Sequence, residues 1–305
     1  MTLTILYAIL EILGMFAVGW LARHFGYIRE DELNRWSRFV IDFLMPALVF
    51  HSILVGFESG RTTEIWVLPL AGFGIIAFGG AAGVLFRLTL RTGSRDLART
   101  FHHFCAVNNY GFLPILIIQS LWGEPALARL FFLNIGSAIG YWTIGVGLLG
   151  EQRWGQTARN ILSPNLAATL LALLFALAGW RPFVPELVVN IAGSMGRAAV
   201  PCILILVGAG LYPFPSLRHR AVMGYLTLIR LVLLPAATVA AVALFGLPED
   251  VRNVIWVVAL MPVPVSSIIL TRRYGGDPDF AAGAAVVTTL LSLVTVPAAL
   301  SLLLR

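Results

Sequence analysis

The sequence predicts an all-α integral membrane protein with ten transmembrane helices, arranged as two inverted five-helix repeats. Three observations support this prediction. Hydrophobic residues make up 59% of the 305 residues and charged residues only 12%, whereas soluble domains carry about 25% charged residues. Ten apolar stretches are long enough to cross a hydrocarbon core about 30 Å thick, which takes about 20 helical residues. The two halves of the chain also share turn motifs at matching positions.

The ten expected spans alternate with short connections, which leave no room for a soluble domain. In the first half they cover residues 3–22, 36–55, 65–86, 100–121 and 127–149. In the second half they cover residues 165–184, 186–211, 221–246, 251–270 and 280–304. Barrel strands would alternate apolar and polar residues over about ten positions, and the last span is apolar almost all round, so helices are favoured. The first span lacks the flanking features of a cleaved signal peptide, and we expect it to be retained.

The arginines predict the orientation of the chain. All 21 basic residues are arginines, and 14 of them fall on one side of the ten-span arrangement while five fall on the other. The larger group is Arg23, Arg29, Arg35, Arg38, Arg87, Arg91, Arg95, Arg99, Arg153, Arg159, Arg218, Arg220, Arg272 and Arg273. The smaller group is Arg61, Arg129, Arg181, Arg252 and Arg305. Because cytoplasmic loops are enriched in basic residues, we expect the larger group inside the inner (plasma) membrane and both termini outside it.

Composition also excludes several classes of protein. The formal charge of +6 is explained by arginines at helix ends, so no nucleic acid is expected as a partner. Cys105 and Cys202 fall inside predicted helices and are interpreted as small apolar residues, without a disulfide, a metal or a cofactor. The sequence contains no H-E-x-x-H, G-x-S-x-G or paired-aspartate motif, so an enzyme is the remote alternative. The expected partners are the bilayer and a small solute, and a homodimer is left open.

The internal repeat divides the chain at residue 150. Gly123-Glu124-Pro125, followed by Ala128, matches Gly276-Asp277-Pro278, followed by Ala281, at an offset of about 153 residues. Residues 1–150 and 151–305 then each hold five helices, and the odd number turns the second copy upside down. Two equivalent inverted halves that exchange conformations would open a central site to alternate sides of the membrane. Chance similarity between apolar helices is the alternative.

The fourth and ninth helices are expected to be broken at residues 108–114 and 261–267. Proline removes a backbone donor and glycine lowers the cost of unwinding. Unwound backbone at membrane depth persists only where it lines a cavity or is buried in protein, so paired breaks indicate a binding site, although ordinary proline kinks are the alternative. The candidate substrate-binding residues are Asn108, Asn109, Gly111, Pro114, Pro262, Pro264, Ser266 and Ser267.

Three stretches, residues 46–50 (Pro-Ala-Leu-Val-Phe), 109–115 and 261–278, resemble the auxin efflux carrier family, and the likeness extends over essentially the whole chain. Asn109, Gly111 and Phe112 match the family's N-x-G-[FY] motif. The resemblance implies carriage of small organic acids, two inverted five-helix repeats, termini outside, and a crossover of broken helices 4 and 9, as in bile-acid and sodium/proton carriers. It also implies a scaffold of helices 1, 2, 6 and 7 and a moving transport part of helices 3–5 and 8–10. Leu116 stands where many members have proline, and Pro114 where glycine is common, which places the break slightly earlier here.

Titratable residues inside the predicted helices are functional candidates, because an unpaired charge at mid-bilayer costs about 3 kcal/mol. Glu11 lies midway along the first span and is the preferred site for a coupling proton, with an ion-paired or interfacial group as the alternative. Asp42 is interpreted as either a coupling group or an interfacial group close to water. His102 and His103 are expected at the cytoplasmic boundary, which makes a proton-shuttle role for them a lesser alternative.

Arg197 and Arg230 are the two arginines expected within helices 7 and 8. Their guanidinium groups suit a carboxylate substrate. Pairing with a buried acid or with helix C-terminal carbonyls would explain them equally well.

The function expected from these features is secondary transport of a small organic anion, either an auxin-like acid or a dicarboxylate. The second halves of the broken helices should begin near Leu113 and Ser266, and helix N-termini favour anions. The C-termini of the first halves meet at the same place and could hold a cation instead. A sodium-coupled symporter of bile-acid type and a cation/proton antiporter are therefore the alternatives, and coupling to protons, sodium or neither is left open.

Overall fold

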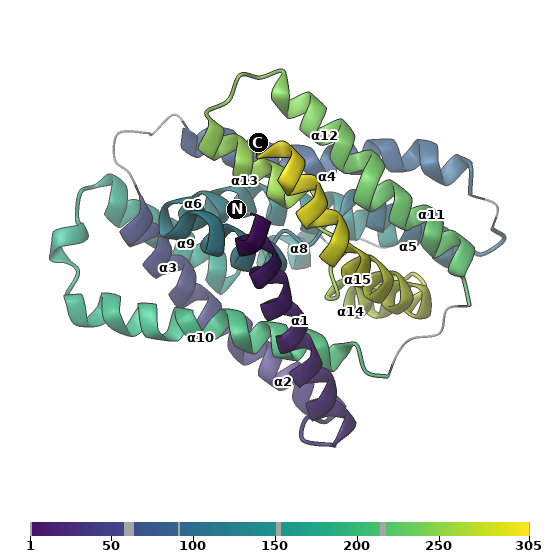
Figure 1. Cartoon of the computed structure of the whole chain (residues 1–305), viewed down its shortest axis with the longest axis horizontal. Helices are drawn as coiled ribbons and strands as arrows, with labels where there is room; N and C mark the ends of the chain where they lie inside the picture. Colours follow the sequence, from purple (N-terminus) through teal and green to yellow (C-terminus); the bar gives the residue numbers. More distant parts are fainter. Residues whose placement is uncertain (1, 58–63, 91, 151–153, 214–217, 305) are drawn as a thin grey trace.

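The protein is all-helical in the computed structural model, which describes residues 2–57, 64–90, 92–150, 154–213 and 218–304 (Figure 1). No β-strand occurs in these residues. The predicted all-α class is confirmed. Arg61, Arg91, Arg153 and Arg305, which contributed to the predicted orientation, lie outside the described residues.

The helices follow one another through short connections. In the first half they are α1 (Thr2–His24), α2 (Glu30–Phe39), η1 (Val40–Leu44), α3 (Met45–Gly56), α4 (Glu64–Leu88), α5 (Arg95–Ala106), α6 (Phe112–Gly140), η2 (Tyr141–Gly145) and α7 (Val146–Leu149). In the second half they are α8 (Trp154–Ile161), α9 (Pro164–Leu177), η3 (Arg181–Phe183), α10 (Glu186–Gly210), α11 (Arg220–Leu228), η4 (Ile229–Leu233), α12 (Leu234–Ala243), α13 (Glu249–Ala259), α14 (Ser267–Tyr274) and α15 (Pro278–Leu303).

Six stretches of the described chain are long and apolar enough to cross a membrane. They become seven if the bent pair Gly155–Ile161 and Pro164–Leu177 forms one span. The helices that flank the expected breaks are too short to span alone, since α5 has 12 residues, α13 has 11 and α14 has 8. Phe112–Leu149 is one continuous stretch by this criterion, but Gly123 within it has a φ of 70° and is not helical. A turn is therefore present where the Gly-Glu-Pro motif predicts one.

Two π-helical turns widen long helices just before prolines. η1 ends two residues before Pro46, and η4 ends two residues before Pro235. A proline ring in a regular helix would clash with the carbonyl four residues earlier, and a widened turn relieves this clash without ending the helix. The second of these turns contains Arg230.

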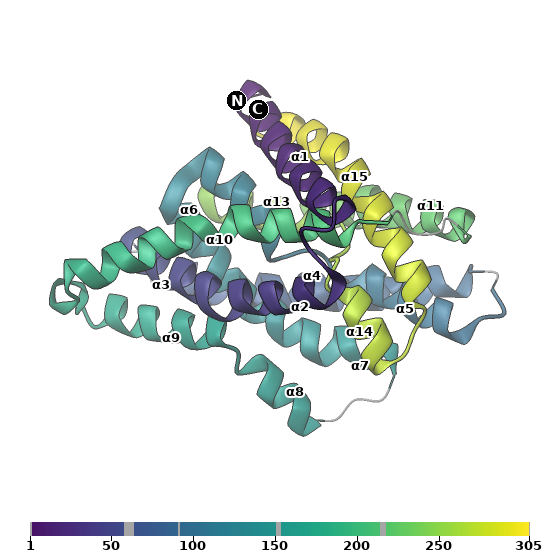
Figure 2. The same cartoon turned by 90° about the horizontal axis from the view of Figure 1, so that it is seen from below.

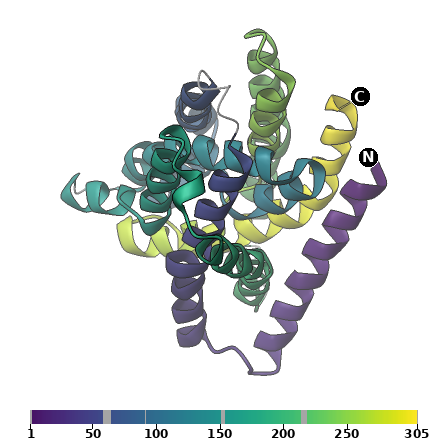
Figure 3. The ribbon, with the colours of Figure 1, turned by 90° about the vertical axis from the view of Figure 1, so that its left-hand side faces the viewer.

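Two sets of neighbouring helices pack closely, and α3 and α6 join them. α1 packs along α10, and α3 packs against both α9 and α10, whereas α4 packs against α5 and α6. Figure 2 shows the start of α1 beside the end of α15, and Figure 3 shows these two helices as neighbours at one side of the molecule. The two ends of the described chain therefore lie close together.

Glycine allows the closest helix contact. Gly136 of α6 faces the backbone of α4, and a Cβ atom at this position would overlap the Pro69 carbonyl oxygen. Membrane helices depend on such small residues because lipid chains are as apolar as a leucine interface, so tight packing supplies much of the attraction.

We expect Gly136→Ala to destabilise the protein by about 1–3 kcal/mol, because the added methyl group forces α4 and α6 apart. Gly74→Ala on α4 is the matched control, since its Cβ meets no atom within 4 Å. Thermal unfolding of both variants in detergent measures the difference. Equal stability of the two variants would contradict this account of the α4–α6 contact.

Candidate functional site

The two interrupted helices meet at one place. α5 and α6 are separated by residues 107–111, and α13 and α14 by residues 260–266, none of which is helical. The backbone N–H of Asn109 donates a hydrogen bond to the carbonyl oxygen of Pro262 over 2.7 Å. We call these two non-helical segments and the helix ends beside them the crossover.

The crossover contains all eight residues that the sequence selects for substrate binding. Gly111 is partly buried and Ser266 is exposed. The other six are buried, namely Asn108, Asn109, Pro114, Pro262, Pro264 and Ser267. Most of the unwound backbone is therefore enclosed by protein, which is the condition for irregular backbone in a membrane.

The two neighbouring asparagines hold different helix ends. The Asn108 Nδ2 group donates to the carbonyl oxygen of Val258, in the last turn of α13. Asn109 Oδ1 accepts the N–H of Phe112 over 3.1 Å and so caps the start of α6. The Asn109 Nδ2 group forms no hydrogen bond within the described part of the chain, which leaves its two hydrogens available to a ligand.

The start of α6 keeps unpaired backbone donors. Asn109 uses the N–H of Phe112, and Pro114 has no N–H. The N–H groups of Gly111 and Leu113 have no acceptor within the described residues. This helix start can therefore bind an anion through backbone N–H groups.

The start of α14 differs from the sequence expectation of a second unsatisfied N-terminus. Its first three N–H groups donate over 3.1 Å to carbonyls three residues earlier, because a tight turn extends the helix backwards. The three pairs are Ser267 with Pro264, Ile268 with Val265, and Ile269 with Ser266. The polar groups that α14 offers are consequently its serine hydroxyls rather than its backbone.

Arg230 lies between the C-terminal ends of the two first half-helices. Its side chain is 1% exposed. Nη1 donates to the carbonyl oxygen of Cys105 over 3.2 Å, and Nε donates to that of Met261 over 3.3 Å. Cys105 belongs to the last turn of α5, and Met261 follows the end of α13. Of the alternatives left open for Arg230, the structure shows pairing with helix-end carbonyls, whose partial negative charge it offsets.

The other three charged residues selected from the sequence are exposed. Arg197 donates to Ser194 Oγ on its own helix over 2.8 Å, and Glu11 and Asp42 lie on outward-facing positions. Arg197 and Glu11 are therefore not enclosed by protein, because these positions fall on the outer faces of α10 and α1. Within the described residues, no Asp or Glu is buried, and Arg230 is the one buried side chain with a permanent charge.

The histidines lie deeper than the sequence suggests. α5 begins at Arg95, where Ser94 Oγ accepts the N–H of Leu97. The expected boundary at residue 100 placed both histidines at the start of a helix, whereas they lie about two turns after the start of α5, with His103 in its last turn. The N-cap serine was the sequence signal for the correct start.

Each histidine contacts a different part of the molecule. His102 Nε2 lies 2.8 Å from the carbonyl oxygen of Gly80 in α4. His103 Nδ1 lies 2.7 Å from the carbonyl oxygen of Gly145, and its Nε2 lies 2.8 Å from Ser267 Oγ. His103 is 0% exposed, and its contact with Ser267 connects α5 directly to the crossover.

An aromatic side chain that the sequence did not single out completes this side of the crossover. Tyr141 Oη lies 3.4 Å from Ser266 Oγ. The Tyr141 ring packs against Tyr110, with 5.8 Å between ring centroids. No motif pointed to Tyr141, because its position follows from how η2 packs.

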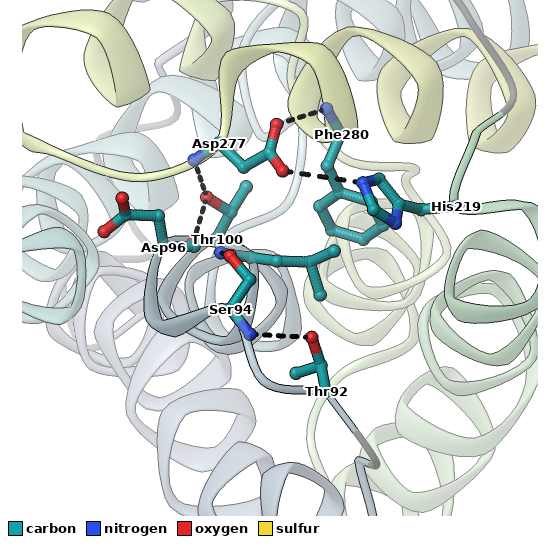
Figure 4. A network of polar contacts seen from close by, with 8 residues as sticks. Thr92, Ser94, Asp96, Thr100, His219, Asp277 and Phe280 are labelled. Atoms are coloured by element: carbon teal, nitrogen blue, oxygen red, sulfur yellow. Dashed lines mark hydrogen bonds and ion pairs between the residues drawn. The ribbon is translucent and has the colours of Figure 1, made fainter.

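A separate polar network joins the start of α5 to the start of α15 (Figure 4). The Asp277 N–H donates to Thr100 Oγ1, which in turn donates to the Asp96 carbonyl oxygen. Asp277 Oδ1 accepts the N–H of Phe280 and caps α15, while Oδ2 lies 3.8 Å from His219 Nε2. The Gly-Asp-Pro turn at residues 276–278 thus has a structural role in fixing α5.

Comparisons with known proteins agree with a membrane carrier. The chain matches the family described as "Membrane transport protein" over residues 4–158 and 156–300. It is 27% identical to an "Uncharacterized transporter" of Methanothermobacter thermautotrophicus, over 95% of each chain. It is 23% identical to another of Methanocaldococcus jannaschii, over 94% of this chain and 95% of that one. A Rhizobium meliloti protein named "Putative malonate transporter" is 23% identical over 97% of this chain and 94% of its own.

The family match covers nearly the whole sequence, and the described helices include at least six stretches able to cross a membrane. The chain therefore belongs to the membrane transport protein family, the auxin efflux carrier family that its crossover motifs resemble.

Proposed function

We propose that the protein is a secondary transporter that moves a small organic anion across the membrane by alternating access at the crossover. The substrate is a carboxylate, either a dicarboxylate or an auxin-like acid. The observation that carries this proposal is the position of Arg230 at the carbonyl ends of α5 and α13.

The argument for an anion rests on charge balance. Each helix C-terminus carries a partial charge of about −0.5, so two such ends together would attract a cation. The guanidinium of Arg230 offsets this charge through two hydrogen bonds. The start of α6 then offers donors, namely Asn109 Nδ2 and the N–H groups of Gly111 and Leu113, which suit a carboxylate.

The surroundings of the crossover favour transport of an organic anion over cation/proton antiport. A cation site would be expected to include a buried carboxylate, and none is buried in the described residues. The relative named for malonate supports a dicarboxylate within the proposed class.

The proposed mechanism uses ten spans in two inverted repeats, residues 1–150 and 151–305. Of the ten predicted spans, spans 1, 2, 6 and 7 form the scaffold, and spans 3–5 and 8–10 form the moving part. The scaffold spans contain α1, α3, α9 and α10. The packing of α1 on α10, and of α3 on α9 and α10, supports this division. The start of α1 and the end of α15 are adjacent, which supports an even number of crossings (Figure 2). The proposed location is the plasma membrane, with both termini facing outward.

Asn109→Ala should lower malonate uptake by purified protein in liposomes at least tenfold, because it removes both the free amide donor and the cap of α6. The matched control is Asn190→Ala, since Asn190 is exposed on α10. Saturable uptake of organic cations but of no carboxylate would overturn the proposed substrate class. Normal malonate uptake by Asn109→Ala would place the binding site elsewhere.

Arg230→Gln should lower both the folding stability, by about 1–3 kcal/mol, and the affinity for malonate, because two buried helix-end carbonyls lose a charged donor. Arg197→Gln serves as the control, because Arg197 is exposed and bonds only within its own helix turn. Thermal unfolding with and without malonate measures both effects. Indistinguishable behaviour of the two variants would reject the charge-balance argument.

The orientation is tested with a membrane-impermeant thiol reagent on intact cells. We expect a cysteine tag at either terminus to react, and Gly93→Cys, next to the arginine-rich start of α5, to be protected. Gly93 is suitable because a side chain there meets no atom within 4 Å. The reverse pattern of labelling would invert the proposed topology.

A further inference from the structure

We propose that His103 binds a proton together with each organic anion, and that Ser267 connects this proton to the anion at the crossover. The inference rests on the proposed function and adds a coupling ion and the residue that binds it. It assigns transport as symport of a proton with a carboxylate.

The two neighbours of the His103 ring fix its neutral tautomer. The Gly145 carbonyl oxygen can only accept a hydrogen bond, so His103 Nδ1, at 2.7 Å, must carry a hydrogen. In the neutral ring, Nε2 then has no hydrogen and accepts one from Ser267 Oγ, at 2.8 Å. In this state the Ser267 hydroxyl hydrogen is directed at the histidine and is withheld from any ligand.

Protonation of His103 reverses the second of these bonds. A proton added to Nε2 makes this nitrogen a donor, and Ser267 Oγ becomes its acceptor. The Ser267 hydroxyl hydrogen is then released and can be donated to a carboxylate beside Ser266. The Tyr141 hydroxyl, which borders both serines, is placed to take part in the same arrangement.

The surroundings of His103 contain no counter-ion in the described part of the chain. His102 on the same helix and Tyr141 on η2 lie beside His103. Around these two neighbours, Arg87 at the end of α4 acts on His102, Tyr110 in the crossover packs on Tyr141, and Arg230 on η4 bonds to Cys105. None of these is an acid.

A buried imidazolium without a negative partner costs free energy. A carboxylate at the crossover would supply the missing negative charge. Binding of the anion therefore favours binding of the proton, and by reciprocity the proton favours the anion by the same factor.

His102 provides the comparison that makes the assignment specific. It is also buried in α5, but its Nε2 bonds to the Gly80 carbonyl oxygen, and no hydrogen bond joins it to α14 within the described residues. A general effect of a buried histidine would arise from either residue, whereas coupling through Ser267 requires His103.

The test measures malonate affinity of the purified protein in lipid nanodiscs between about pH 6.5 and 8.5, where carboxylates stay ionised. The unsubstituted protein should bind malonate more weakly as pH rises, by up to about tenfold per pH unit for one linked proton. His103→Gln should bind with an affinity independent of pH. His102→Gln should keep the dependence.

Three results would overturn the inference while leaving the proposed function intact. These are pH-independent binding by the unsubstituted protein, an unchanged pH dependence in His103→Gln, and loss of the dependence in Glu11→Gln, which would assign the proton to Glu11. Binding of no carboxylate at any pH would reject the proposed function and the inference with it.

A measurement on the unsubstituted protein guards against misfolding of the variant. Nitrogen NMR of ¹⁵N-histidine-labelled protein at a fixed pH should show one imidazole changing from the singly to the doubly protonated form when malonate is added. The signal that changes should be absent from His103→Gln and present in His102→Gln. Absence of any change in the unsubstituted protein that binds malonate would overturn the assignment.

Discussion

The need to satisfy backbone groups in the interrupted helices governs the centre of this molecule. A helix that stops inside a membrane leaves carbonyl oxygens with partial negative charge, and lipid offers them no donor. Arg230 meets this need at both stops at once, because its planar guanidinium donates to the carbonyl oxygens of Cys105 and Met261. The donors at the start of α6 are then not opposed by the charge of these two helix ends.

The same requirement explains why the asparagines stand next to each other. Asn108 completes the end of α13, and Asn109 completes the start of α6, so neighbouring residues of one chain segment hold helices from both halves of the sequence. The backbone bond from Asn109 to Pro262 joins the two segments directly. A shift of one half-helix would therefore alter both asparagines, which suits a site that has to change shape during transport.

α14, the helix after the second interruption, contributes different groups from α6. The first N–H groups of α14 are already bonded within its own turn, so its contribution depends on the hydroxyl of Ser267 and on the histidine that orients it. The crossover is thus chemically asymmetric, with backbone and amide donors on the α6 side and a hydroxyl–imidazole pair on the α14 side. This asymmetry separates the group that binds an anion from the group that senses a proton.

The sequence by itself determined the features that depend on local chemistry. Glycine and proline marked the crossover breaks and the turn at Gly123, because these residues change the backbone wherever they occur. Only the tertiary structure decided that Glu11 and Arg197 are exposed and that His103 and Arg230 are buried. In a membrane both the lipid-facing and the protein-facing sides of a helix are apolar, so α1 and α10 carry no pattern that reveals which side a charged residue occupies. The partners of Arg230 and His103 come from segments 31 to 164 residues away, and such contacts are set by packing rather than by local sequence.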